Sequence, residues 1–159
     1  MIDETVLARA LHVLGVVFWI GGVAMVTTIL LPAVRRFEEP REGIAMFHKI
    51  EKRFAWQARF TTLLTGASGF YMIDSLDAWS RFTDAAYWWV YPMVAVWLIF
   101  TIMLFVLEPL VLDKWFRVRA ARDPRRTLVI IQRMHWILLS ISLLSIFAAV
   151  AGSHGWLPF

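Results

Sequence analysis

Residues 10–34 read ALHVLGVVFWIGGVAMVTTILLPAV, a run that contains no Asp, Glu, Lys or Arg. About 20 apolar residues, rising 1.5 Å each, cross a hydrocarbon core of roughly 30 Å, so this run can span a bilayer as one helix. A segment inside lipid must be helical, because its backbone finds no water to pair with. Three more apolar runs follow, and together they predict membrane spans at about 8–34, 54–74, 86–112 and 127–155.

The composition supports lipid as the main surroundings of the chain. Its 159 residues are 60% hydrophobic and 18% charged, and a soluble domain of this size could not bury so much apolar surface. We therefore expect a single all-α domain over residues 1–159, a four-helix transmembrane bundle. The first run is longer than a signal-peptide core and has no small-residue cleavage site, so we expect it to be retained. The absence of cysteine excludes disulfides, thiolate-bound zinc, iron–sulfur clusters and c-type haem.

Lys and Arg are distributed unevenly among the connecting segments. Seven fall in residues 35–59 and six in residues 113–126, whereas the N-terminal segment and residues 74–84 hold one each. Because cytoplasmic loops carry the excess of basic residues, thirteen against two predicts that both chain ends lie outside (N-out, C-out) in a bacterial inner (cytoplasmic) membrane. The net charge of +4 sits between apolar runs, so it does not indicate a nucleic-acid partner.

Two acidic residues followed by proline predict where helices begin. Asp123 before Pro124 is typical of an N-cap and a first helical position, and Glu39 before Pro40 has the same form. A helix from Pro40 to the end of the second span would run about 33 residues, or roughly 50 Å. It would therefore project beyond the membrane.

Four histidines are the main candidates for chemistry, because a titratable side chain in or beside lipid is costly. Three of them begin stripes of small residues at helical spacing. One interpretation is close helix packing, which small residues permit, with each histidine bonded to a neighbouring helix. The other is a flat macrocycle held by histidine, with glycines leaving room for its ring. The candidate cofactor-binding residues are His12, His48, His135, His154, Gly15, Gly22, Gly66 and Gly69, and the four histidines are also the candidate metal ligands.

Depth along the helices favours one histidine pair. His48 and His135 lie 8 and 11 residues beyond the predicted helix starts, a height difference of roughly 4–5 Å. One iron is within reach of both, so we predict an inner haem between them. We expect His12, with or without His154, to hold another haem nearer the outside.

Glu108, next to Pro109, is the one carboxylate in the third predicted span. A buried glutamate needs a partner, and helix depth places Arg133 and Arg59 near its level. We expect Arg133 to pair with it, and a proton-relay role for Glu108 is the alternative. Arg53, Arg59 and Arg133 are also candidates for holding haem propionates.

Copper is the competing metal. Cu(I) sites favour cysteine and clustered methionine. The chain has no cysteine, and its seven methionines never occur as Met-x-x-Met, which counts against copper transport. Zinc-hydrolase motifs, a phosphate loop and a nucleophile elbow are also absent from the sequence.

Several short motifs are shared with a known group of proteins. They are Leu11-His12-Val13-Leu14-Gly15, Phe18-Trp19-Ile20-Gly21-Gly22, Lys52-Arg53-Phe54-Ala55 and Leu64-Thr65-Gly66. These motifs resemble the copper-resistance protein D (CopD) superfamily of small bacterial membrane proteins. The related HemJ-type protoporphyrinogen oxidases are four-helix proteins that bind b-type haem, so the resemblance implies that His12 is a haem ligand. HemJ-type proteins also carry a third-helix lysine that residues 85–107 lack, which argues against porphyrinogen oxidation.

The sequence therefore predicts a membrane protein with bis-histidine b-type haem that transfers electrons. One or two haems are expected, and whether the protein is itself an oxidoreductase is left open. The expected partners are the lipid bilayer, a quinone or redox protein, and a second copy of the chain. The alternatives are a CopD-like copper transport or resistance protein and a non-catalytic membrane subunit.

Overall fold

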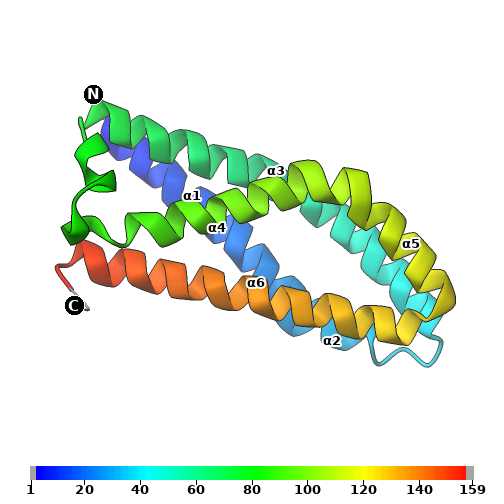
Figure 1. Cartoon of the computed structure of the whole chain (residues 1–159). Helices are drawn as coiled ribbons and strands as arrows, with labels where there is room; N and C mark the ends of the chain where they lie inside the picture. The colour runs from blue at the N-terminus through cyan, green and yellow to red at the C-terminus, as the bar shows by residue number, and fades with distance from the viewer. Residues whose placement is uncertain (1–2, 157–159) are drawn as a thin grey trace.

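Helices account for nearly all of the chain that the computed structural model describes, residues 3–156, and no strand occurs in that part (Figure 1). Four rods follow one another, and the first and third change helix type along their length. They are α1 (Glu4–Met25), continued by a π-helical turn (Val26–Leu30) and α2 (Leu31–Val34); α3 (Pro40–Ser75); α4 (Val90–Ile102), continued by a π-helical segment (Met103–Leu112) and α5 (Asp113–Arg122); and α6 (Pro124–Ser153). The all-α prediction is confirmed.

The rods pack along one long axis, with α1 crossing behind α4 in the view of Figure 1. Both described ends of the chain lie at one end of the molecule, together with the two 3-10 turns, Trp79–Phe82 and Ala85–Tyr87, that connect α3 to α4. The α2–α3 and α5–α6 connections lie at the opposite end. We call these the terminal end and the basic end, because most Lys and Arg residues fall near the second.

Three of the four rods are long and apolar enough to cross a membrane. They are Glu4–Val34, Val90–Arg122 and Pro124–Ser153. The predicted span 54–74 lies within α3, which is not among them. Polar residues such as Gln57 and Arg59 interrupt its apolar sequence, so the membrane crossing of α3 stays a prediction.

The outer surface of α6 fits a lipid environment. Ile137, Leu144 and Phe147 point outward, with 63%, 67% and 62% of their surface exposed. Ser142 and Ser145, on the other face, are buried. An apolar outside around a more polar inside is the arrangement expected of a helix that faces lipid on one side and helices on the other.

The helix starts follow the acidic–proline pairs. The Asp123 carboxylate accepts a hydrogen bond from the Arg126 N–H at 2.9 Å, and Pro124 takes the first position of α6. Pro40 likewise opens α3, although Glu39 makes no side-chain capping bond. α3 has 36 residues and is slightly longer than expected.

The third rod is shifted toward the basic end relative to the predicted span 86–112. Asp84 caps a 3-10 turn by accepting from the Ala86 N–H at 2.9 Å, and the α-helix begins only at Val90. At its other end the helix continues to Arg122, because α5 extends it with polar residues that hydropathy alone does not include.

Two apolar clusters hold the rods together. The one in the middle of the bundle contains Trp19, Ile20, Val23, Ala58, Val96, Phe100, Leu104 and Leu139. The one toward the basic end contains Val26, Leu30, Leu31, Val34, Phe47, Leu128 and Ile131. Members of both clusters line the cavity described next.

Candidate functional site

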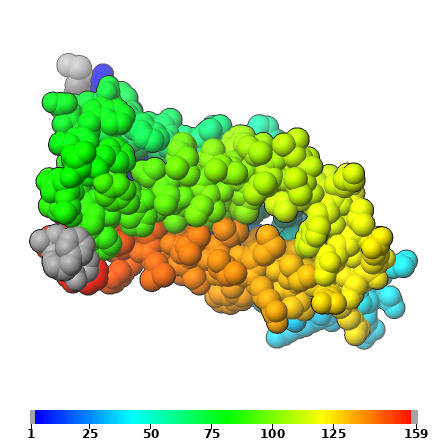
Figure 2. All heavy atoms as spheres, viewed as in Figure 1, coloured from blue at the N-terminus to red at the C-terminus, as the bar shows by residue number. Residues whose placement is uncertain are grey.

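A cavity of about 420 Å³ lies between α3, the third rod and α6. Figure 2 shows a hollow between the yellow-green part of the third rod and the orange α6. Both inner histidines line the cavity, His48 from α3 and His135 from α6. Much of its wall is apolar and includes Phe54, Phe100, Pro109, Leu112, Phe116 and Leu138.

The third rod borders the cavity with its π-helical segment, Met103–Leu112. Ten residues is long for a π-helix, which usually occurs as a single turn and often at functional sites. In this geometry each N–H bonds to the carbonyl five residues earlier, as the Asp113 N–H does with Glu108. Pro109 has no N–H, so the carbonyl of Leu104 loses its partner within the helix.

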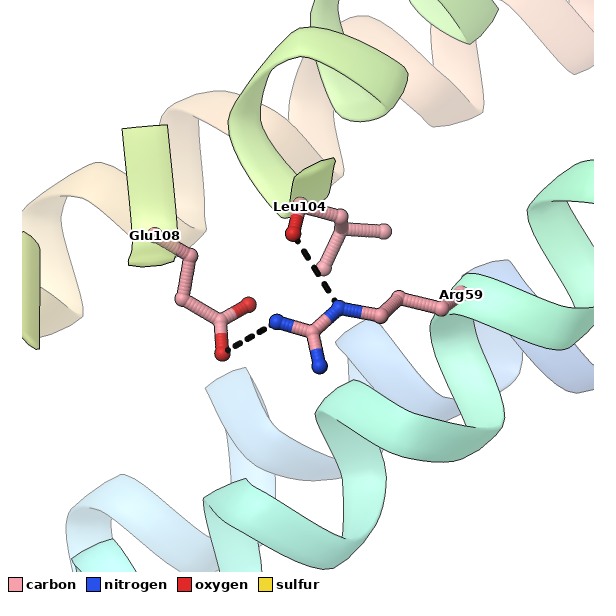
Figure 3. Close-up of polar contacts among 3 residues, drawn as sticks. All are labelled: Arg59, Leu104 and Glu108. Atoms are coloured by element: carbon pink, nitrogen blue, oxygen red, sulfur yellow. Dashed lines mark hydrogen bonds and ion pairs between the residues drawn. The ribbon is translucent and has the colours of Figure 1, made fainter. Parts of the chain in front are cut away.

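Arg59 from α3 supplies the missing donor. Its Nε donates to the Leu104 carbonyl at 3.1 Å, and its Nη2 lies 3.0 Å from Glu108 Oε1 (Figure 3). One guanidinium therefore bonds both the carbonyl freed by Pro109 and the carboxylate beside that proline. This contact ties α3 to the third rod across one side of the cavity.

The predicted partner of Glu108 was wrong. Arg133 is exposed on α6 and forms no ion pair with Glu108. Depth placed Arg133 and Arg59 at a similar level, but Arg133 faces outward, next to the buried Ile131 and Gln132. Arg59 pairs with Glu108 because its side chain points toward the third rod, whereas that of Arg133 points away.

The imidazole of His135 is held in a fixed orientation. Its Nδ1 lies 2.9 Å from the Ile131 carbonyl, one turn earlier in α6. A carbonyl can only accept, so Nδ1 carries a proton, and in the neutral ring Nε2 keeps its lone pair. Histidines that ligate metals commonly have this second-nitrogen bond.

His48 borders the same aromatic pair as His135. Its ring stacks on Phe116 with 5.2 Å between centroids, and His135 meets Phe47 edge-on at 6.5 Å. Phe47 and Phe116 are themselves 6.0 Å apart. Burial, and then the nearby charge of Lys52, lower the pKa of His48, which lies before the predicted span 54–74. Its imidazole is therefore neutral at pH 7 and able to ligate.

Glu51 is a cavity residue that the sequence interpretation did not identify. Burial raises its pKa to about 7, and the nearby carboxylates of Glu108 and Asp113 add to the shift. The signal was helical spacing, because Glu51 lies three residues after His48 on the face that continues to Ala55. Glu51 stands among charged residues in the sequence, a pattern typical of an exposed segment, so its burial was not predicted.

The structure does not bring the other two histidines into this cavity. His12 Nδ1 lies 2.9 Å from the Thr65 carbonyl and 3.4 Å from Ser68 Oγ, so His12 is bonded to α3. His154 is exposed, and its Nδ1 lies 2.7 Å from the Val150 carbonyl of its own helix. The His12 contact is the one expected of a histidine that bonds a neighbouring helix, whereas His154 makes no such contact in the described structure.

The four candidate glycines face side chains of the protein. A Cβ on Gly66 would lie 2.6 Å from the indole of Trp97, and one on Gly69 would lie 3.1 Å from His12 Cε1. Gly15 likewise abuts Thr65, and Gly22 abuts the ring of Phe54. The space beside these glycines is thus taken by α1, α3 and α4. These contacts favour close helix packing at all four positions.

No protein-family model, curated protein or solved structure matches the chain. The resemblance to CopD-like and HemJ-type proteins therefore stays a prediction. Among residues 3–156, no group of three or more His, Cys, Asp or Glu side chains is arranged to hold a metal ion. An iron whose porphyrin already supplies four nitrogens needs only one or two protein ligands, so a haem does not require such a group.

Proposed function

We propose that the protein binds one b-type haem in this cavity, with His135 and His48 as its ligands, and transfers electrons. The observation that carries the proposal is that imidazoles from two different helices line one cavity. The volume of about 420 Å³ lies within the roughly 300–1,000 Å³ of cofactor pockets. Its aromatic and aliphatic wall suits a flat, apolar ring, and Lys52 offers a positive charge for a propionate.

The residues of this chain would prepare the site in two ways. The Ile131 carbonyl fixes the His135 tautomer, which leaves Nε2 as the ligating atom. Burial keeps His48 neutral, as a ligand must be. Two histidine ligands leave no open position for oxygen, so the bound haem would supply one-electron transfer. A quinone or a redox protein is the proposed partner.

The proposal covers one haem rather than two. Neither His12 nor His154 is among the side chains that line the cavity, and we therefore propose no haem at the terminal end.

The proposed setting is a bacterial inner membrane, crossed four times with both chain ends outside. Three rods support it by their length and apolar character, and the cluster of Lys and Arg at the basic end supports the orientation. In this setting the cavity lies in the cytoplasmic half of the bundle. A reporter active only in the cytoplasm should give signal when fused after Arg122 and none when fused after Phe159.

The haem proposal is tested by the absorbance and haem content of the purified protein. The parent should show a Soret band, reduced α-bands and one haem per chain by pyridine haemochrome. His135→Ala should lose most of that haem, while His154→Ala, a matched change at an exposed histidine, should keep it. A parent that contains copper instead of haem would favour the copper alternative, and a parent with neither would favour the non-catalytic subunit.

A further inference from the structure

The outward face of α5 carries both apolar and basic side chains. It combines exposed apolar side chains with three cations, in a shallow groove that begins at Leu110 in the preceding π-helical segment. Leu110, Val111 and Val118 have 71%, 52% and 49% of their surface exposed. The cations are Lys114, Arg119 and Arg122. We call these six residues, with Trp115, the α5 groove.

The cations of the α5 groove have no acidic partner among residues 3–156. Asp113, the carboxylate nearest in sequence, forms its ion pair with Arg117 at 3.1 Å. Asp123 is used as the N-cap of α6. The positive charge of the groove is therefore not neutralised by the described part of the protein.

Arg119 is held in place and still lacks a hydrogen-bond acceptor. Its guanidinium carbon lies 5.7 Å from the centre of the Trp115 ring, within the range of a cation–π contact. Its Nε atom is buried and has no hydrogen-bond partner in the described structure. The stacking on Trp115 therefore positions the guanidinium of Arg119, and no hydrogen bond from Nε to residues 3–156 competes for its charge.

The groove changes from apolar to cationic along the helix axis. Leu110 and Val111 come first, Lys114, Trp115 and Val118 follow, and Arg119 and Arg122 come last. The twelve residue steps from Leu110 to Arg122 correspond to about 18 Å. Lys114 and Val118 alternate around Trp115 in the middle, and the apolar and cationic ends of the groove match the hydrocarbon core and the charged surface of half a bilayer.

We propose that the α5 groove binds an anionic phospholipid. Its phosphate would meet Arg119, Arg122 and Lys114, and an acyl chain would follow Val118, Val111 and Leu110. A soluble anion would leave those apolar side chains uncovered. The helix ends a rod that is long and apolar enough to cross a membrane, so lipid is the neighbour expected there. This inference is independent of the proposed haem.

The test compares lipid binding to the purified protein in an uncharged detergent by native mass spectrometry. The probes are phosphatidylglycerol and phosphatidylcholine with the same acyl chains. Because a basic residue near an anionic lipid contributes about fivefold in affinity, the double change Arg119→Gln and Arg122→Gln should weaken phosphatidylglycerol binding about 25-fold. Binding of phosphatidylcholine should change little.

A matched control removes two cations at the same end of the molecule. Arg125 and Arg126 are exposed at the start of α6, outside the groove. Changing both to Gln should leave phosphatidylglycerol binding within about twofold, because the lost charges do not contact the lipid. An equal loss in this control would overturn the proposal, as would equal binding of the two lipids by the parent.

Two further measurements keep the outcome decisive. Inorganic phosphate should not displace phosphatidylglycerol, and full displacement would show a soluble-anion site instead. Arg122 is exposed, so the single change Arg122→Gln should fold even if the double variant does not. It should weaken phosphatidylglycerol binding about fivefold, and unchanged binding would contradict the proposal.

Discussion

The two halves of the bundle begin from similar sequence features and reach different structures. At the terminal end, His12, Gly15, Gly66 and Gly69 form a closed contact filled by protein side chains. Toward the basic end, His48 and His135 border a cavity of about 420 Å³. A histidine followed by small residues is therefore compatible with either outcome, and the neighbouring helix decides which one forms.

The deciding neighbour at the basic end is the π-helical segment of the third rod. Pro109 removes one intrahelical hydrogen bond, and Arg59 restores it from α3. Toward the terminal end the third rod is a regular α-helix, α4, and its Trp97 packs directly on Gly66. The wide turns of the third rod thus lie beside the cavity, and its regular turns lie beside the closed contact.

The largest expected effect comes from removing Arg59. Arg59→Ala leaves Glu108 without its ion pair and Leu104 without its donor. We expect about 2–3 kcal/mol of destabilisation, less than a fully buried pair because both side chains retain some solvent contact. Thermal or SDS unfolding in detergent would measure it. Arg133→Ala should cost under about 0.5 kcal/mol. If Arg133→Ala destabilised the protein more than Arg59→Ala does, Arg133 and not Arg59 would be the partner of Glu108.

The closed contact at the terminal end should not tolerate even one added methyl group at Gly66. Gly66→Ala would place its Cβ 2.6 Å from the Trp97 indole. That ring cannot swing away freely, because its Nε1 donates to the Thr62 carbonyl at 2.9 Å. We expect a loss of about 1–3 kcal/mol from overpacking.

Gly21→Ala is the matched control for this change. Nothing lies within 4 Å of a Cβ at that position. Alanine should therefore be neutral or stabilise α1 by up to about 1 kcal/mol. Equal destabilisation of both variants in the same unfolding assay would show that the contact around Gly66 is not specifically tight.

The sequence was sufficient for the helices and for part of the site. The apolar runs predicted the helical rods, and Asp123 with Pro124 predicted the start of α6. Counting residues from the helix starts predicted that His48 and His135 lie at a similar depth, and both line the cavity. It did not give the direction of Arg133, because depth along a helix says nothing about which way a side chain faces. The π-helix was also not predictable, since hydropathy is the same for α and π geometry.

A smaller effect should appear in the pH dependence of stability. Burial raises the pKa of Glu51 to about 7, above its ordinary value near 4.5. The folded state therefore holds this proton more tightly than the unfolded state. The stability that the proton gives is complete below about pH 4.5 and is lost as the pH rises through 7.

Glu51→Gln isolates this contribution. The variant keeps the shape of the side chain and cannot ionise, so it should gain stability over the parent above pH 7. We expect about 1 kcal/mol, reduced from the full shift because the cavity admits solvent. Unfolding curves of both proteins at pH 5 and pH 8 would measure this gain. A stability difference between variant and parent that is the same at the two pH values would contradict the raised pKa of Glu51.

The smallest effect on stability should come from filling the cavity itself. Ala55 is 3% exposed and lines the cavity, so Ala55→Leu can direct its added atoms into open space. Overpacking a filled core typically costs about 1–3 kcal/mol, and here we expect less than about 1 kcal/mol.

The same change, Ala55→Leu, should remove the proposed haem, because the leucine occupies part of the space that the ring needs. Gly66→Ala should show the opposite combination, reduced stability with the haem retained. Unfolding curves and pyridine haemochrome counts on the two variants measure both quantities in the same preparations. If Ala55→Leu unfolds as readily as Gly66→Ala, the basic half is as closely packed as the terminal half and the contrast between them is lost. If it is stable and keeps its haem, the haem lies elsewhere.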